Sequence, residues 1–199
     1  MSFDLLVALS AFAFVSSITP GPNNLMVMAS GANFGFRRSI PHMLGIGLGF
    51  GFMIVLVGLG LAQIFETYPV AHTILKVASI GYLTWLAWKI ANAAAPQEQG
   101  TSGTPMTFLQ AAAFQWVNPK AWTMALTAIT VYAADQSAQS ILLVAGIFVL
   151  INIPSVSSWT VLGQQMRRFL TSPRRLRAFN FTMAGLLILS LYPVIGPMG

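Results

Sequence analysis

Two helix-breaking polar stretches interrupt apolar segments of this chain, one near its start and one in its second half. Proline removes a backbone donor and glycine adds backbone freedom, so neither stretch continues a regular helix. Within lipid, a break frees backbone polar groups that need new partners, so it persists where it lines a cavity or binds a ligand. Two such breaks at corresponding places indicate a transporter. The first reads Thr19, Pro20, Gly21, Pro22, Asn23, Asn24, and the second reads Asn118, Pro119, Lys120.

The composition places the chain in a membrane rather than in water. Of its 199 residues, 56% are hydrophobic and only 7% are charged, and its mean hydropathy is +0.73. Soluble domains carry about 25% charged residues, so a soluble globular fold is excluded. The net charge of +6 does not indicate nucleic acid, because the basic residues cluster between apolar runs instead of forming a stripe with aromatic residues. We expect membrane lipid around the chain and no nucleic-acid partner.

Several kinds of site are missing from the sequence. Cysteine is absent, which excludes disulfide bonds, thiolate metal ligands and a cysteine nucleophile. His42 and His72 are isolated, so we interpret each as a surface or capping residue and expect no metal site. Paired carboxylates and a Gly-x-Ser-x-Gly serine are also absent at membrane depth. The sequence therefore predicts no cofactor, no metal and no enzymatic activity.

Six apolar windows have the length of about 20 residues that a helix needs to cross a bilayer. The amino terminus lacks the basic region of a signal peptide, so the first window stays a membrane span. The first, fourth and fifth windows contain interior prolines, which predict broken or tilted helices. The sequence thus predicts an all-α integral membrane protein with six transmembrane helices, of which helices 1 and 4 are broken. The windows cover residues 5–33, 40–64, 70–92, 108–133, 139–166 and 178–197.

The spans fall into two groups of three within a single transmembrane domain, residues 1–199. A polar linker rich in proline, glycine and serine, residues 93–107, separates a first repeat at about 1–92 from a second at about 108–199. An odd number of spans in each half means that the second half enters the membrane in the opposite orientation. We therefore expect two inverted three-helix repeats.

The positions of the breaks and glycines are consistent with such a repeat. Pro22 aligns with Pro119, and Gly49 with Gly146, at one common offset of 97 residues. The similarity of the halves rests mainly on hydropathy and on the position of the breaks, because few residues are identical.

Basic residues lie on one side of the predicted spans. Lysines and arginines are enriched in cytoplasmic loops, so this side is predicted to be cytoplasmic and both termini to lie outside. The residues are Arg37 and Arg38 after the first span, Lys89 at the end of the third, and Arg167, Arg168, Arg174, Arg175 and Arg177 between the fifth and sixth.

The chain has four carboxylate side chains, and none lies at the predicted midplane. They are Asp4, Glu66, Glu98 and Asp135. A buried-acid proton relay is therefore missing. Asp4 and Asp135, near the predicted outer face, are the remaining candidates for coupling transport to an ion gradient.

The first break offers a place for a carboxylate group. A helix that restarts after Pro22 presents free amino-terminal amides and the positive end of its dipole. Asn23 and Asn24 add side-chain donors and acceptors. The alternative is a short first helix followed by a surface turn, although apolar residues on both sides favour one crossing. The candidate substrate-binding residues here are Thr19, Pro20, Gly21, Pro22, Asn23 and Asn24.

The second break places a lysine inside the predicted membrane. It lies about 17 Å along the fourth span at the usual helical rise. An intramembrane cation normally faces a cavity or the protein interior, where it serves a substrate carboxylate, an internal partner or a proton step. Alternatively, Lys120 snorkels to the cytoplasmic surface because the span begins later. Asn118, Pro119 and Lys120 are candidate substrate-binding residues.

Two further groups have a functional and a packing interpretation. Asn152 and Ser155, beside Pro154 in the fifth span, either line the same pathway as substrate-binding residues or bond helix carbonyls. Alternating glycines in the second span have Gly-x-x-x-Gly spacing, which favours close helix packing over nucleotide binding. These glycines are Gly45, Gly47, Gly49 and Gly51.

Together these motifs resemble the LysE superfamily of lysine exporters and threonine/homoserine exporters, over essentially the whole chain. Residues 114–120 match the pattern of that superfamily in the second half. Residues 22–24 and 85–90 are most similar to the branch that exports cysteine and O-acetylserine. The resemblance rests on residues 18–24, 35–39 and 82–89 and on the glycine-rich second span.

The resemblance implies an inner-membrane exporter of amino acids or close derivatives, driven by an ion gradient rather than by ATP. The chain shows no phosphate-binding Gly-Lys-Ser/Thr loop. The scarcity of intramembrane acids fits a neutral or anionic amino-acid substrate better than a dibasic one. A passive channel, a regulatory membrane subunit and a membrane-embedded enzyme are alternatives, and the sequence leaves open whether the protein is a monomer or a homo-oligomer.

Overall fold

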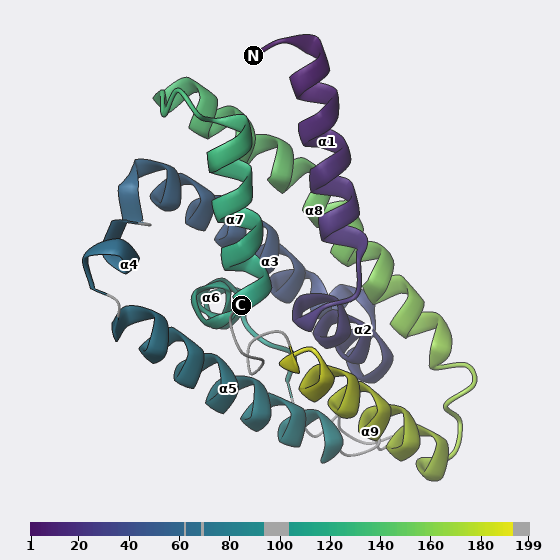
Figure 1. Cartoon of the computed structure of the whole chain (residues 1–199). Helices are drawn as coiled ribbons and strands as arrows, with labels where there is room; N and C mark the ends of the chain where they lie inside the picture. Colours follow the sequence, from purple (N-terminus) through teal and green to yellow (C-terminus); the bar gives the residue numbers. More distant parts are fainter. Residues whose placement is uncertain (62, 69, 94–103, 193–199) are drawn as a thin grey trace.

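The computed structural model describes residues 1–61, 63–68, 70–93 and 104–192, and every regular element within them is helical (Figure 1). The predicted all-α class is therefore confirmed. Most of the predicted linker and the carboxyl terminus lie outside the described residues. The elements are α1 (Phe3–Ile18), α2 (Pro22–Phe34), α3 (Phe36–Leu56), η1 (Val57–Leu61), α4 (Gln63–Thr67), α5 (Val70–Ala91), α6 (Phe108–Phe114), η2 (Gln115–Val117), α7 (Pro119–Tyr132), α8 (Ala138–Met166) and α9 (Pro173–Leu189).

Several helices have the length and apolar character of membrane spans. Three are Phe36–Leu61, Val70–Ala91 and Ala138–Met166, and the pair α1 and α2, bent by 54° at the first break, makes a fourth. The protein is thus a multi-pass membrane protein, and the arrangement of six spans in two inverted repeats stays a prediction.

The helix that corresponds to the sixth predicted span begins before the apolar window from which the span was predicted. Helix α9 starts at Pro173 instead of residue 178, because Ser172 caps it by accepting a hydrogen bond from the Arg175 amide at 3.3 Å. Proline in the first helical position and a serine cap fix a helix start whatever the polarity of the turn that follows.

Helix α8 is the central element of the fold, since it packs against α1, α2 and α3 (Figure 1). It runs without a break through Pro154, so the expectation of a broken fifth span was wrong, whereas the alternative of a tilted span stays a prediction. The hydroxyl of Ser155 donates to the Ile151 carbonyl at 2.8 Å, and that of Ser158 donates to the Ser155 carbonyl at 2.7 Å. Serine hydroxyls and neighbouring helices supply partners for the backbone around a proline in such a helix.

Helices α2 and α8 approach each other through two glycines that we did not single out in the sequence. A Cβ on Gly31 would collide with the Thr160 carbonyl, and one on Gly163 would collide with the Met28 carbonyl. Each helix therefore presents a glycine to the backbone of the other, which is how helices pack closely in membranes.

The glycines of the second span are also in close contacts. A Cβ on Gly49 would lie 2.6 Å from the Cα of Ala112 in α6, and Gly45 faces the Phe108 carbonyl of the same helix. Gly47 and Gly51 face side chains of α8, those of Ile153 and Val149. One face of α3 thus packs on α6 and another on α8. By contrast, a Cβ on Gly146 would meet no described atom within 4 Å.

The buried apolar side chains form two large clusters, and the chain passes from one to the other at each break. The first cluster includes Leu9 of α1, Ala121 of α7 and Phe148 of α8. The second includes Leu25 of α2 and Phe114 of α6, together with residues of α5 and α9. The first break joins α1 to α2 and the second joins α6 to α7. Both breaks consequently lie where the chain passes from one cluster to the other.

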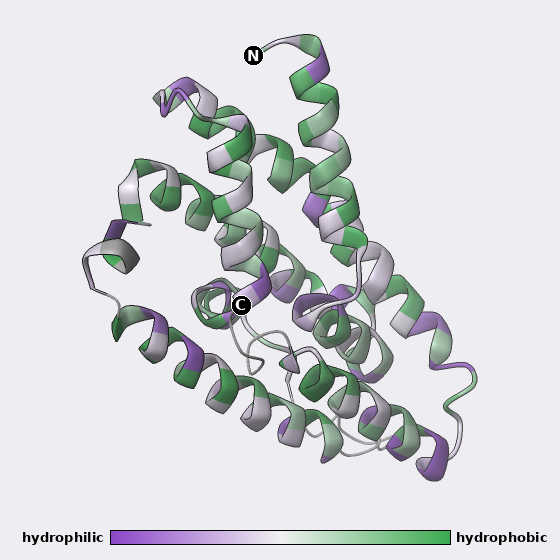
Figure 2. Ribbon diagram, viewed as in Figure 1, coloured by the Kyte–Doolittle hydropathy of each residue, from purple (hydrophilic) through white to green (hydrophobic). Residues whose placement is uncertain are grey.

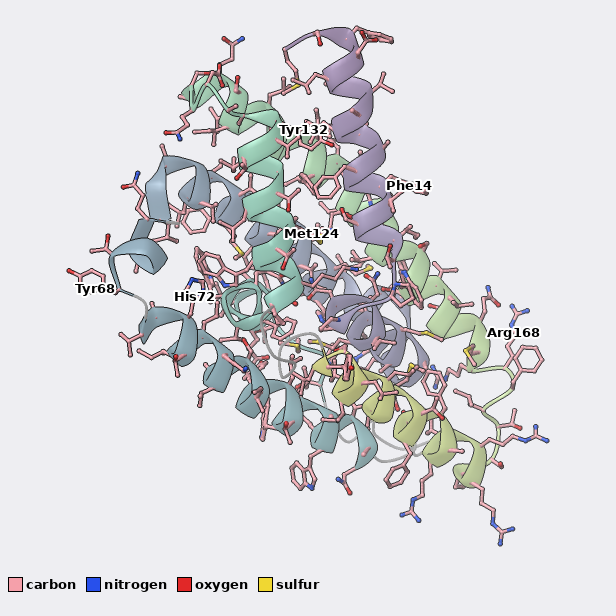
Figure 3. All side chains as sticks on the ribbon, viewed as in Figure 1. Phe14, Tyr68, His72, Met124, Tyr132 and Arg168 are labelled. Carbon is pink, nitrogen blue, oxygen red and sulfur yellow. The ribbon has the colours of Figure 1, made fainter. Side chains whose placement is uncertain are left out.

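Hydrophilic residues concentrate at one end of the molecule, around the connection between α8 and α9 (Figure 2). Arg37 and Arg38 line one hollow there together with Arg167 and Arg168. Arg168 lies at the far end of α8, whereas His72 lies at the opposite side of the view (Figure 3). Many large apolar side chains are exposed on the helices, as a lipid-facing surface requires.

Candidate functional site

The two breaks, far apart in the sequence, contact each other directly. The ammonium group of Lys120, in the first turn of α7, donates a hydrogen bond to the carbonyl of Thr19 at 2.7 Å. Gly21 permits this contact, because a Cβ at that position would lie only 2.8 Å from Cδ of Lys120. The two breaks therefore meet at one junction, where the Lys120 side chain reaches the end of α1, and the depth of this junction in the membrane stays a prediction.

The end of α1 is held by side chains from three other helices. The amide nitrogen of Asn24 in α2 donates to the carbonyls of Ser17 and Thr19 at 2.8 and 2.9 Å. The indole of Trp159 in α8 donates to the Ile18 carbonyl at 3.1 Å, and Lys120 of α7 provides the third contact. Helix ends expose carbonyls and carry partial negative charge, so amide, indole and ammonium donors all stabilise this end.

Asn23 forms a reciprocal pair with Gln115 of η2. Asn23 Nδ2 donates to Gln115 Oε1 at 2.9 Å, and Gln115 Nε2 donates to Asn23 Oδ1 at 3.1 Å. Gln115 is fully buried and also donates to the Ala111 carbonyl at 2.9 Å. We did not identify Gln115 as a site residue from the sequence, although a glutamine inside an apolar segment immediately before a break was the available signal.

The two helices that restart after the breaks differ at their amino termini. In α7, Oδ1 of Asn118 accepts from the backbone amide of Lys120 at 3.2 Å, so the helix is capped by its own residue. In α2, Gly21 is the N-cap, and no side chain in the described part of the protein caps that turn. The amino-terminal turn of α2 therefore keeps free donors and the positive end of the dipole, which together attract an anion.

A small cavity of about 20 Å³ lies at this junction. Its wall combines polar groups from both breaks and α8 with an apolar side formed by three residues of α3 and α7. At this size it has room for about one water molecule. Met124, which forms part of the apolar side, lies in the interior of the bundle (Figure 3). The lining residues are Ser16, Ser17, Gly21, Asn23, Asn24, Phe50, Asn118, Lys120, Ala121, Met124 and Asn152.

The cavity wall carries one buried acceptor that is not used. Asn152 Nδ2 donates to the hydroxyl of Ser17 at 3.2 Å, while Asn152 Oδ1 is buried and finds no hydrogen-bond partner within the described residues. Leaving a buried acceptor unpaired costs about 1–3 kcal/mol, so such a group usually has a ligand or a water in the working protein. The cavity thus offers a cation and free amides for an anion, and an amide oxygen for a donor.

A larger hollow of about 650 Å³ lies on the other side of Lys120, between α5, α7 and α9. Gly21 and Lys120 line both spaces, so the junction borders on each of them. Pro20, Pro22 and Pro119 line the larger hollow rather than the small cavity.

Not every predicted site residue reaches the cavity. Ser155 does not line it, because its hydroxyl bonds the Ile151 carbonyl within α8, which corresponds to the packing interpretation. Thr19 contributes its carbonyl to the junction and not its side chain, since its hydroxyl bonds the Val15 carbonyl. The residues that the structure brings together from the prediction are Gly21, Asn23, Asn24, Asn118, Lys120 and Asn152.

The two candidate coupling acids lie at helix starts away from the cavity. Asp4 is exposed in the first turn of α1. Asp135 accepts from the hydroxyls of Ser137 and Ser140 at 2.9 and 3.0 Å, at the beginning of α8. These hydrogen bonds hold the pKa of the Asp135 carboxyl below its ordinary value, so it stays ionised near neutral pH. Both positions place a negative charge at the positive end of a helix dipole.

His42 is not a surface or capping residue, as we expected from the sequence. Only 2% of its surface is exposed, and it lies inside α3. The expectation failed because the beginning of α3 is covered by α2 and α6, and the sequence does not indicate which turn of a helix is covered by its neighbours.

Comparisons with known proteins agree with the motifs. A family model described as LysE type translocator matches residues 14–191. The cysteine/O-acetylserine efflux protein of Escherichia coli strain K12 is 31% identical over 191 residues, which is 94% of this chain and 96% of that protein. A protein of the same name from Shigella flexneri is 31% identical over 187 residues, 92% of this chain and 94% of that protein. No solved structure matches the chain significantly.

Proposed function

The chain belongs to the family of LysE type translocators, and on that premise we propose that it is a secondary active exporter of small zwitterionic amino acids across the inner membrane. Membership of a translocator family makes it an amino-acid transporter rather than an enzyme. The observation that carries the finer proposal is the meeting of an uncapped helix start, a lysine and an unpaired amide oxygen on one small cavity.

Each end of an amino acid has a complementary group at this junction. The substrate carboxylate binds the first-turn amides of α2 and the ammonium group of Lys120, which donates one hydrogen bond to Thr19 and has further N–H donors. The substrate ammonium binds Oδ1 of Asn152, the unpaired acceptor. Charge-assisted hydrogen bonds of this kind are about twice as strong as neutral ones, so the pair distinguishes a zwitterion from water.

The small volume of the cavity supports a mechanism in which the site opens on one side at a time. Space for about one water does not admit an amino acid, so the described conformation is closed around the site. The chain passes between the two apolar clusters at each break, and in the proposed mechanism a change of backbone direction at the breaks widens the junction. The carboxylate then replaces the Thr19 carbonyl as the partner of Lys120, which prevents an unpaired buried charge at any stage.

The relatives provide the substrate class for the proposal. Two of them are named as efflux proteins for cysteine and O-acetylserine, and both compounds are small zwitterions. Within the described residues no carboxylate lines the cavity, which disfavours a dibasic substrate with a second cation. We therefore propose cysteine-like and O-acetylserine-like amino acids as substrates.

The orientation in the membrane is also part of the proposal. The cluster of arginines around the start of α3 and the connection between α8 and α9 is the cytoplasmic end. The start of α1 and the connection between α7 and α8 lie at the opposite end of the molecule, which places the amino terminus outside (Figure 1). Phosphatase and fluorescent-protein fusions after Gly199 test the predicted outside carboxyl terminus, which lies beyond the described residues.

Transport by the purified protein in liposomes tests the function. Radiolabelled O-acetylserine, cysteine, threonine, homoserine and lysine are supplied separately, with and without an imposed ion gradient. We expect accumulation of O-acetylserine and cysteine against their own gradients, abolished by an uncoupler, and no accumulation of lysine. Movement only down the substrate gradient indicates a channel, and preference for lysine contradicts the proposed substrate class.

A further inference from the structure

A second cavity, of about 330 Å³, lies between α2, α3 and α5 and is separate from the substrate junction. Its wall includes Asn33 of α2, His42 of α3 and Lys89 of α5. Asn92 and Ala93 line this cavity and also the neighbouring hollow that Arg174 and Arg177 line. The cavity therefore lies toward the arginine-rich end of the molecule.

His42 is buried on this wall without any hydrogen bond. Both ring nitrogens are inaccessible to water, and neither finds a partner among the residues that the structure describes. Oδ1 of Asn33 is also buried and unpaired, although Asn33 Nδ2 donates to the Ala29 carbonyl at 2.8 Å and to Asn180 at 3.2 Å. A neutral imidazole has one N–H donor and one acceptor, so an orphaned histidine leaves two buried polar groups unsatisfied.

The neighbouring polar groups do not explain this arrangement. Ser30 and Ser39 bond each other at 2.7 Å, and Ser39 also donates to the Gly35 carbonyl at 2.9 Å. Both serines are therefore satisfied without His42. Buried polar atoms are normally paired, and an exception in a functional protein requires a reason such as a ligand that comes and goes.

The surroundings of His42 contain few charges. Lys89 is the charged side chain on the cavity wall, and its ammonium group lies 5.3 Å from the centre of the Trp85 ring. Of the helices packed against α3, α2, α6 and α8 have no charged residue and α7 has only Lys120, at the other junction. Helix α3 itself has Arg37 and Arg38 in its first turn. No described carboxylate lines the cavity, so no group there fixes a permanent charge on the imidazole.

Helix α2 connects the two cavities. Its first residues line the substrate junction, and residues from Met26 to Phe34 line the second cavity. Its middle is held against α8 at Gly31 and Gly163. Helix α2 therefore contributes to the walls of both the substrate junction and the cavity of His42, and coupling between the two through α2 is part of the inference that follows.

We infer that this cavity is the binding site of the coupling proton and that His42 is the group that carries it. The inference rests on the proposed ion-driven export. One proton adds to the free ring nitrogen, giving an imidazolium with two N–H donors, for which Asn33 Oδ1 is the unpaired acceptor on the same wall. Because the ring nitrogens are inaccessible to water in the described conformation, the cavity wall around His42 opens in the exchange step, and the same proton then leaves to water on the arginine-rich side, where the charge of Lys89 favours its release. Only a proton moves, and no other reactant is consumed.

The test separates coupling from substrate passage by two assays on the same liposomes. The first is uptake of radiolabelled O-acetylserine driven by an imposed pH gradient, and the second is exchange of labelled for unlabelled O-acetylserine without any gradient. In His42→Gln, which keeps a hydrogen-bonding side chain but cannot take a proton, we expect gradient-driven uptake to fall to the level of protein-free liposomes while exchange continues. His72→Gln, at the only other histidine of the chain, is the matched control and should retain both activities.

Several results would overturn the inference. One is gradient-driven uptake by His42→Gln at the level of the parent. Another is loss of exchange together with gradient-driven uptake in folded His42→Gln and His42→Asn, which would assign His42 to the substrate pathway. Proton movement in the parent, followed with a trapped pH-sensitive dye on addition of O-acetylserine, does not depend on the folding of any variant, and its absence would also overturn the inference. A parent that performs neither exchange nor uptake contradicts the proposed function instead.

Discussion

The two helix breaks are similar in sequence, but the helices that follow them have different amino-terminal caps in the structure. Both restart a helix with a proline in its first position, Pro22 in α2 and Pro119 in α7. The second break is closed by Asn118, which caps its own helix, and α7 then extends Lys120 across to the end of α1. The first break has Gly21 at the cap position and no side-chain cap among the described residues. In the proposed function, the first break therefore receives the substrate carboxylate, and the second provides the ammonium group of Lys120.

This difference makes the junction asymmetric, although both breaks restart a helix with a proline. A zwitterion has two unlike ends, and a site made of two identical breaks would present the same group twice. The asymmetry needs few substitutions. It arises because the start of α2 has no side-chain cap among the described residues, whereas Asn118 caps the start of α7. The predictions below test that division, in order of decreasing expected effect.

The largest effect is expected from Lys120→Met. The change removes the cation. The Thr19 carbonyl now accepts hydrogen bonds from the side chains of Asn24 and Lys120, and in the variant only the bond from Asn24 remains. We expect export of O-acetylserine by liposomes to fall to background, while the protein is still recovered from the membrane. Normal export by this variant would contradict the role of Lys120, and the carboxylate contact would then lie at the α2 amides alone.

The next effect compares the aligned glycines of the two halves. Gly49→Leu forces a side chain into the backbone of α6, and overpacking costs about 1–3 kcal/mol. We expect less folded protein on size-exclusion chromatography and a lower unfolding temperature. Gly146→Leu is the matched control, because that position has open space, and it should be tolerated. Equal damage at both positions would indicate that the halves pack more symmetrically than the structure shows.

A smaller effect is expected from the amide pair that joins the breaks. Asn23→Ala leaves Oε1 of Gln115 without its donor, and Gln115→Ala leaves both amide atoms of Asn23 without their partners, so each change should lower the stability of the protein by about 1–3 kcal/mol. The double variant should lose less than the sum of the two, with a coupling of about 0.5–3 kcal/mol in a thermal-unfolding cycle. Additive losses would show that the two side chains act independently.

The smallest effect concerns the helix caps themselves. Asn118→Ala removes the cap of α7 and should lower its stability by about 1 kcal/mol, measured by thermal unfolding in detergent. Asn118→Ser keeps a capping oxygen and should retain most of that stability. If Asn118→Ala leaves the unfolding temperature unchanged, the cap does not distinguish the second break from the first.

Several properties of the site followed from residue types alone. Proline and glycine break helices wherever they occur in a run such as 19–24, and a lysine in an apolar segment needs a partner, so both breaks and Lys120 were predictable. The site residues Gly21, Asn23, Asn24 and Asn118 followed for the same reason, because polar groups beside a break in lipid are held by other polar groups.

Other properties depended on which helix face meets which neighbour. Pro154 was expected to interrupt its span and did not, because serine hydroxyls and three packed helices stabilise α8. His42 was expected at the surface and is buried, and Gln115, Gly31 and Gly163 were not singled out at all. Contacts between segments that are far apart in the chain set these outcomes, and no local pattern encodes them.

By itself, the sequence determined that this protein is helical, embedded in a membrane and broken at two places, because hydropathy and backbone chemistry are local properties. Only the tertiary structure decided that the breaks meet, that Lys120 donates to Thr19, and that Asn152 and His42 keep unpaired polar atoms facing separate cavities. The physical reason is that hydrogen-bond satisfaction and burial are properties of pairs of segments, and the packing of α8 against α1, α2 and α3 selects those pairs.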